Sequence, residues 1–242
     1  MNGSDTTGPE IRLTCPCCGT GFTSPVAIEQ PVLRVRSDLY RQAAGASQLA
    51  YQIHACPRCG FAGNQQAFAR PTLSEAHRAR VLRDLMPRVR GYYEEPSKPT
   101  GMQSLAALMP RCTSSVKDRV PGHVKYLCAA MVAEWLGESD SLVADYLLKA
   151  GWCAEEGGLQ PRDALLSAVA HFERSLARQT ELRRDQRATV AYLVGELYRR
   201  LGDPARANAW FSTVAREVVD PGEQSWLVDA ARRQQLAPED WL

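Results

Sequence analysis

The sequence predicts a mixed, mainly α-helical protein in which a small β head precedes an antiparallel helical array. Five of the eight cysteines lie within the first 60 residues, in two short turn-like motifs with apolar alternation between them. From about residue 120 onward, apolar residues instead recur with a helical period. We therefore divide the chain into a head (1–90), a linker containing proline and glycine (91–104) and a helical domain (105–242).

The composition is that of an ordinary globular protein. The chain has 242 residues, of which 45% are hydrophobic and 23% charged, so global disorder is excluded. No stretch approaches the ~20 apolar residues that a membrane-spanning helix needs. Residues 1–14 also lack the apolar core of a signal peptide. We therefore predict a cytoplasmic protein without a membrane partner, in which the cysteines remain reduced.

Two segments of the head alternate between apolar and polar residues with the period of a half-buried strand. These segments are Pro31–Arg36 and Tyr51–Cys56. A helix follows, and its predicted start is a capping box formed by Thr72 and Glu75. With 3.6 residues per turn, the apolar face of this helix consists of Val81, Leu82, Leu85, Met86 and Val89.

Two copies of the motif C-P-x-C-G carry the clearest chemical signal. The first runs from Cys15 to Gly19 and the second from Cys56 to Gly60, with 37 residues between Cys18 and Cys56. In each copy the proline presets a tight turn, and the glycine lets the backbone fold back toward the sulfur atoms. Two such turns supply the four thiolates that zinc prefers in a structural site. We predict a zinc-ribbon-like head with one structural zinc ion, held by Cys15, Cys18, Cys56 and Cys59.

The remaining cysteines and one histidine have separate predicted roles. Cys17 lies inside the first motif as an accessory thiol beside the metal, either inert or redox-sensitive. His54 fits the alternation of its strand as a residue that does not bind the metal. Cys112, Cys128 and Cys153 fall in or near apolar helical patterns, which favours buried and inert side chains.

Six tail helices are predicted from the apolar period and from their start signals. Asp203 followed by Pro204, and Asp220 followed by Pro221, each combine an N-cap residue with proline at the first helical position. Because only Gly202 and Asp203 separate two of the helices, these two should be antiparallel neighbours. The predicted helices are His123–Leu136, Ser141–Glu156, Pro161–Gln179, Arg184–Leu201, Pro204–Val218 and Pro221–Leu236.

The segment Ala191–Val219 has residue offsets similar to those of one tetratricopeptide repeat. Small residues stand where two helices must approach closely, and aromatic residues stand where the space between them must be filled. The agreeing positions are Gly195, Tyr198, Gly202, Ala207 and Phe211. A plain helical bundle with coincidental matches is the alternative, and either array offers a groove for a protein partner.

The two cysteine motifs and the late helix together resemble an uncharacterised bacterial family, the domain of unknown function 2225. Besides C-P-x-C-G near the N-terminus, the resemblance rests on Ala55–Gly63 (ACPRCGFAG) and Tyr192–Asp203 (YLVGELYRRLGD). It spans roughly Leu13 to Val219. The resemblance implies a zinc-ribbon-like head fused to a tetratricopeptide-like tail in a cytoplasmic bacterial protein, and it implies no particular activity.

The sequence favours a protein that binds partners over an enzyme. None of the four histidines lies in a zinc-protease motif, and the chain has neither a P-loop nor a dinucleotide-binding glycine pattern. We therefore expect a non-enzymatic adaptor whose helical tail binds a protein. A zinc-linked redox sensor that uses Cys17 is one alternative.

Nucleic-acid binding through the head is the other alternative. Residues 1–90 hold 11 arginines, no lysine and 6 acidic residues, a balance of +5. A zinc ion with four thiolates carries a charge of about −2, which leaves a weakly basic head. The arginines that would form the surface include Arg34, Arg36, Arg58, Arg70, Arg80 and Arg83.

Overall fold

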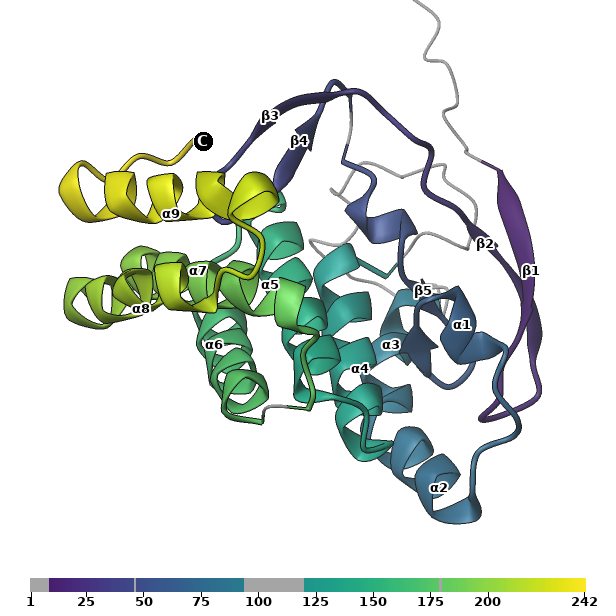
Figure 1. The fold of residues 1–242 in the computed structure, drawn as a ribbon. Coiled ribbons are helices and arrows are strands. Elements are labelled where there is room, and N and C mark those ends of the chain that lie inside the picture. Colours follow the sequence, from purple (N-terminus) through teal and green to yellow (C-terminus); the bar gives the residue numbers. More distant parts are fainter. Residues whose placement is uncertain (1–8, 46, 94–119, 179) are drawn as a thin grey trace, which may run out of the picture.

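The computed structural model describes residues 9–45, 47–93, 120–178 and 180–242 (Figure 1). This part of the chain is mainly helical and has a small head of antiparallel strands, which confirms the predicted fold class. In Figure 1 most of the head lies at the right, while residues 32–43 reach over the top of the tail, whose helices follow one another toward the left. Within the described ranges, no helix is long and apolar enough to cross a membrane.

Within the described residues, the strands form three separate antiparallel pairs. The pairs are β1 (Glu10–Thr14) with β2 (Gly21–Pro25), β3 (Val32–Val35) with β4 (Arg41–Ala43), and β5 (His54–Ala55) with β6 (Ala62–Gly63). Because a two-stranded sheet is at best marginally stable in water, each pair depends on packing against the rest of the chain.

Two strand predictions need correction. The segment Tyr51–Cys56 begins at the end of a 3-10 helix, η1 (Leu49–Tyr51), and only the two residues of β5 pair as a strand. The strand predicted at Pro31–Arg36 is present as β3, but it is not half-buried, since Val32 is 48% exposed and Leu33 66%. Alternation identified extended backbone there, whereas burial depends on which parts of the chain cover the hairpin.

Three α-helices complete the head as far as the structure describes it. Ser74, and not Thr72, caps the second of them, because the Ser74 hydroxyl oxygen accepts a hydrogen bond from the backbone N–H of His77. On the apolar face predicted for this helix, Val81 is buried. Leu85, which follows the last residue of the helix, is buried as well. The helices are α1 (Gln65–Phe68), α2 (Glu75–Asp84) and α3 (Met86–Tyr93).

The linker predicted at 91–104 overlaps the end of α3, because this helix continues to Tyr93. Residues 94–104, the predicted start of the helical domain at 105, and Cys112 lie outside the described residues. The division of the chain into three parts therefore stays a prediction.

All six tail helices predicted from the sequence are present, and each end agrees within two residues. The Asp203 carboxylate accepts a hydrogen bond from the backbone N–H of Arg206, and Asp220 caps its helix in the same manner, as predicted. The helices are α4 (Gly122–Trp135), α5 (Asp140–Glu156), α6 (Arg162–Ala177), α7 (Arg184–Arg200), α8 (Pro204–Glu217) and α9 (Pro221–Leu236).

Helices α7 and α8 form a closely packed antiparallel pair. Gly202 has a φ of +82° at the turn between them, a conformation that favours glycine. A Cβ atom at Gly195 would lie only 2.7 Å from Cδ1 of Phe211, so the missing side chain permits the close approach. Two of the positions that match the tetratricopeptide pattern are therefore in direct contact.

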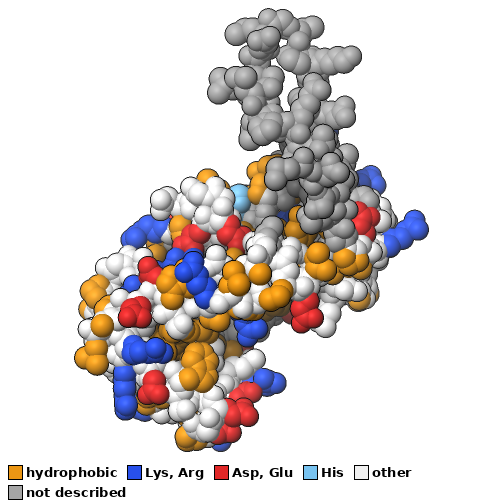
Figure 2. Space-filling view, turned by 90° about the horizontal axis from the view of Figure 1, so that it is seen from above, with side chains coloured by type: hydrophobic (Ala, Val, Ile, Leu, Met, Phe, Trp, Pro, Cys, Tyr) orange, Lys and Arg blue, Asp and Glu red, His pale blue; other side chains and the backbone are white. Residues whose placement is uncertain are grey.

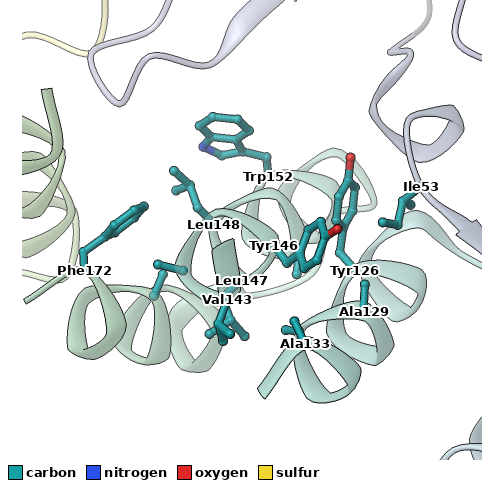
Figure 3. Close-up of a cluster of buried hydrophobic side chains, with 14 of the residues drawn as sticks. Ile53, Tyr126, Ala129, Ala133, Val143, Tyr146, Leu147, Leu148, Trp152 and Phe172 are labelled. Carbon is teal, nitrogen blue, oxygen red and sulfur yellow. The ribbon is translucent and has the colours of Figure 1, made fainter. Parts of the chain in front are cut away.

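The head packs directly on α4. The Tyr126 hydroxyl donates to the carbonyl oxygen of Leu49 at 3.0 Å, and Lys125 Nζ donates to that of Ala50 at 3.3 Å. Figure 3 shows Ile53 of the head beside Tyr126 and Ala129 of α4. The buried apolar side chains of head and tail form one continuous cluster.

Buried ion pairs join the β3–β4 hairpin to the tail. Asp38 follows β3 and has a fully buried side chain, which lies 2.7 Å from Arg36 Nη2 and 3.4 Å from Arg200 Nη1 of α7. Glu196 of α7, also fully buried, accepts a hydrogen bond from Ser37 Oγ at 2.6 Å. Because unpaired buried charges are costly, these contacts specify where the hairpin sits on the helices.

The segment 240–242 runs antiparallel beside β3. The backbone N–H of Ser37 donates to the carbonyl oxygen of Asp240 at 2.9 Å, and that of Leu242 donates to Val35 at 3.0 Å. The guanidinium of Arg34 lies 3.6 Å from the centre of the Trp241 ring. Residues far apart in the sequence therefore share one edge of this sheet.

Candidate metal centre

The first cysteine motif forms the turn between β1 and β2. The backbone N–H of Cys15 donates to the carbonyl oxygen of Thr20 at 3.0 Å, and that of Gly19 donates to Cys15 at 2.9 Å. Gly19 has a φ of +72°, in the left-handed region that glycine adopts most readily. The motif thus folds its two outer cysteines toward the same side of a tight turn.

The second motif repeats this geometry between β5 and β6. The backbone N–H of Cys56 donates to the carbonyl oxygen of Phe61 at 2.8 Å, and that of Gly60 donates to Cys56 at 2.9 Å. Gly60 has a φ of +77°. The two turns are therefore equivalent in their hydrogen bonds and glycine conformation, as the sequence motif predicts.

The two turns bring the four predicted ligands together. The sulfur atoms of Cys15, Cys18, Cys56 and Cys59 lie within 4.8 Å of one another, and Cys15–Cys59 and Cys18–Cys56 are each separated by 3.6 Å. These distances are far longer than the ~2.05 Å of a disulfide bond. A tetrahedral zinc site with Zn–S bonds of about 2.3 Å has S–S separations of about 3.8 Å. The donor set therefore fits a four-coordinate metal ion.

The protonation of these thiols depends strongly on their neighbours. Hydrogen bonding to Cys15 lowers the pKa of the Cys56 thiol, and backbone N–H groups of Cys59 and Arg58 lower it further. Conversely, hydrogen bonding to Cys56 raises the pKa of Cys15, and hydrogen bonding to Cys15 raises that of Cys59. Several thiolates this close together repel one another unless a cation compensates their charge. A bound dication is the group that would hold all four as thiolates.

An aromatic cluster supports the second turn and the β1–β2 hairpin. The ring of Phe68 makes edge-to-face contacts with Phe61 at 5.2 Å and Phe22 at 5.5 Å between ring centres. The backbone N–H of Leu73 donates to the carbonyl oxygen of Pro16 at 3.0 Å, which ties the first turn to the segment before α2. Sequence reasoning did not identify this support.

The β1–β2 hairpin that carries the first turn was also missed. The sequence pattern that could have predicted this hairpin is short, because only Ile11 and Leu13 alternate with polar residues immediately before Cys15. The structure places both strands in register across the turn, with Leu13 opposite Phe22. The side chain of Leu13 is buried in the core of the head.

Cys17 and His54 lie close to the site but outside the sulfur cluster. Cys17 is only 1% exposed, and its sulfur lies 4.0 Å from the carbonyl oxygen of Arg78. His54 is also buried, and its Nδ1 is hydrogen-bonded to Ser24 Oγ at 2.8 Å. Burial lowers the pKa of His54 to about 4, which favours its neutral form.

The cysteines of the tail are buried where the structure describes them. Cys128 is 1% exposed and Cys153 is 7% exposed. Burial raises the pKa of the Cys128 thiol to about 11 and that of Cys153 to about 12. Both remain protonated at neutral pH, which agrees with the prediction of inert core residues.

Most of the arginines that suggested a nucleic-acid surface are engaged within the protein. Their partners are acidic side chains or aromatic rings of the same chain, although Arg34, Arg80 and the Arg83 side chain remain exposed, as does Arg58. The contacts are Arg36 with Asp38 and Glu155, Arg70 with Glu138, Arg83 with Asp84, Arg80 over Trp135, and Arg34 over Trp241.

Comparisons with known proteins identify a family but no function. Neither a curated protein nor a solved structure matches the chain. The family described as "Uncharacterized protein conserved in bacteria (DUF2225)" matches residues 10–237, a range that includes both cysteine turns and all the tail helices. The chain is therefore a member of the bacterial DUF2225 family.

Proposed function

We propose that this protein is a non-enzymatic adaptor in which one structural zinc ion fixes the head and the helical tail binds a protein partner. The observation that carries the proposal is the sulfur cluster, in which four cysteines from two equivalent turns lie within 4.8 Å of one another. Four thiolates complete the tetrahedral shell of zinc and leave no position for water or substrate. Such a site contributes to the free energy of folding and takes no part in catalysis.

The tail supports the binding half of the proposal. Close packing of Gly195 against Phe211 is what a tetratricopeptide-like pair requires. Between α6 and α8 lies a hollow of about 590 Å³, whose lining combines Trp210 with the charged residues Glu173, Arg187 and Arg216. A mixed aromatic and charged lining suits a peptide better than an apolar ligand.

Metal content is the first test. Plasma emission on the tag-free protein should give about one zinc per chain. In the native protein, a thiol-reactive reagent should leave the four ligand cysteines unlabelled, in addition to the cysteines that burial protects. After denaturation with a chelator, the reagent should label all of them. The matched variants are Cys59→Ser, which should lose the zinc, and Cys17→Ser in the neighbouring turn, which should keep it. Zinc-free native protein, or equal zinc in both variants, would refute the assignment.

The partner is tested separately with zinc-loaded protein as bait in lysate of its own organism. The adaptor proposal predicts that the bait captures a protein. This capture should survive nuclease treatment and should weaken when the bait carries Trp210→Ala. Capture that disappears with nuclease and falls steeply with salt would instead support nucleic-acid binding through the head. Zinc release by oxidant that is lost in Cys17→Ser would support the redox sensor, although the burial of Cys17 argues against it.

A further inference from the structure

The hollow between α6 and α8 (lower left in Figure 1) has four charged side chains in its lining. Two of them neutralise each other, because Arg187 Nε lies 2.7 Å from Glu217 Oε2. Glu173 and Arg216 are the other two, and neither forms an ion pair with any described residue. The hollow is therefore neutral as a whole, but it contains one unpaired acidic group and one unpaired basic group.

Neutral hydrogen-bond donors hold the Glu173 side chain in place. Tyr198 Oη donates to Glu173 Oε1 at 2.8 Å, and Trp210 Nε1 donates to the same oxygen at 3.2 Å. Because neither donor is charged, the carboxylate keeps its negative charge. Its second oxygen, Oε2, has no partner in the part of the chain that the structure describes, and the residue is only half-buried. A carboxylate beside an aromatic ring suits a cation with an apolar stem, such as a lysine or arginine side chain.

Three arginines near Glu173 have acidic partners of their own. Arg206 stacks on the ring of Tyr198, whereas Arg174 and Arg178 follow Glu173 in the sequence. The partners are Asp203 for Arg206 at 3.0 Å, Asp140 for Arg174 at 3.0 Å, and Asp140 and Glu181 for Arg178 at 2.8 and 3.6 Å. None of these arginines pairs with Glu173, so its charge stays available to a ligand.

Arg216 lies toward the opposite end of the hollow. It is exposed and belongs to the last turn of α8, six residues after Trp210. At 1.5 Å per residue, this separation is about 9 Å along the helix. Leu176, Thr213 and the Trp210 ring supply apolar surface between the two charges. On the face that carries α9 and the β3–β4 hairpin, by contrast, acidic and basic side chains are interspersed (Figure 2). The hollow thus has an acidic end at Glu173 and a basic end at Arg216.

Resting on the proposed function, we propose that the protein partner enters this hollow with an extended segment that carries a basic and an acidic residue two positions apart. In an extended segment such residues project to the same side and lie about 7 Å apart, and the length of a lysine or arginine side chain covers the remaining distance. The basic group pairs with Glu173 Oε2 while its stem lies against Trp210, and the acidic group pairs with Arg216.

Synthetic peptides test this charge pattern without knowledge of the partner. Fluorescein-labelled nonapeptides carry alanine, leucine or serine at most positions and a variable pair at positions 4 and 6. The five pairs are lysine then glutamate, glutamate then lysine, two lysines, two glutamates, and two glutamines. Fluorescence anisotropy with the zinc-loaded protein should show that one mixed-charge order binds about threefold more tightly than the like-charge and neutral peptides.

Variants assign each charge to its residue. Glu173→Gln keeps an acceptor oxygen for Tyr198 and Trp210 but removes the charge, so it should lose the preference for a basic residue. Arg216→Gln should lose the preference for an acidic residue, and Arg216→Glu should prefer the peptide with two lysines. The matched control is Arg232→Gln on the exposed surface of α9, which should bind like wild type.

Equal or absent binding of all five peptides would overturn the proposal, and so would a mixed-charge preference that survives both Glu173→Gln and Arg216→Gln. Melting temperature and zinc content are measured on each variant, so that binding is compared only between folded proteins. If Glu173→Gln does not fold, the switch of preference in Arg216→Glu decides alone. If the peptides fail but lysate capture still weakens in Trp210→Ala, only the charge pattern is refuted. If capture fails as well, the proposed function is refuted.

Discussion

The glycines that end the two cysteine turns allow one contact to be isolated by mutation. Gly19 and Gly60 have nearly the same φ, +72° and +77°. A Cβ atom at Gly19 would meet nothing within 4 Å, whereas one at Gly60 would lie 2.8 Å from Cγ2 of Val89 and 3.0 Å from the carbonyl oxygen of Leu85. Replacing each glycine by alanine therefore imposes the same backbone penalty but only one steric clash.

The magnitudes follow from these two terms. An L-residue in the left-handed region costs about 1–2 kcal/mol, which is the whole expected effect of Gly19→Ala. Overpacking against a fixed backbone atom adds about 1–3 kcal/mol, so Gly60→Ala should lose about 2–5 kcal/mol. For a chain of this size, each kcal/mol lowers the melting temperature by about 2–4 °C.

Urea unfolding of the zinc-loaded variants, followed by circular dichroism, measures both free energies. The difference between the free energies of unfolding of the two variants isolates the steric clash, because the cost of the left-handed backbone is the same in both. If Gly19→Ala and Gly60→Ala destabilise the protein equally, the second turn does not pack on the α2–α3 junction as described. If Gly19→Ala is the more damaging, the argument from the shared backbone conformation is wrong.

Three further predictions rest on other parts of the molecule. Chelation of the metal should lower the melting temperature and expose four thiols, and unchanged melting would contradict a structural role for the ion. Gly195→Ala should destabilise the protein by about 1–3 kcal/mol through its clash with Phe211, and Phe211→Leu in the same chain should recover part of that loss in a double-mutant cycle. For Asp140, burial alone would raise the pKa, but hydrogen bonds with His171 and Arg174 lower it below 3.8. Its stabilisation is therefore present above that value and lost as the pH falls through the folded pKa, so Asp140→Asn should reduce the loss of stability seen on acidification to about pH 3.

The elements predicted well are those whose signals are local. The tail helices carry their own start signals, such as Asp203 before Pro204, and their apolar faces repeat over several turns. The cysteine turns are likewise written into five consecutive residues, including a glycine whose positive φ the structure confirms. Neither inference needs any knowledge of the tertiary fold.

The elements predicted poorly depend on distant parts of the chain. Val32 and Leu33 read as a half-buried strand, but no local pattern tells which residues cover them. The pairing of Arg36 with Asp38 and Glu155, and of Asp38 with Arg200 of α7, is equally invisible in sequence, so Arg36 was counted as part of a free basic surface. The mutual approach of the two cysteine turns was inferred from the chemistry of zinc, and not from any pattern in the residues between them.

The sheet edge shared by Val35–Ser37 and residues 240–242 affects how the chain folds during synthesis. The two segments are about 200 positions apart, and ribosomes add about 5–20 residues per second. Both cysteine turns are therefore available to fold some 10–40 s before the neighbour of β3 exists. During that interval β3 presents an unpaired edge to any other nascent chain. Early closure of the cysteine turns would leave this edge as the last part of the head to be protected.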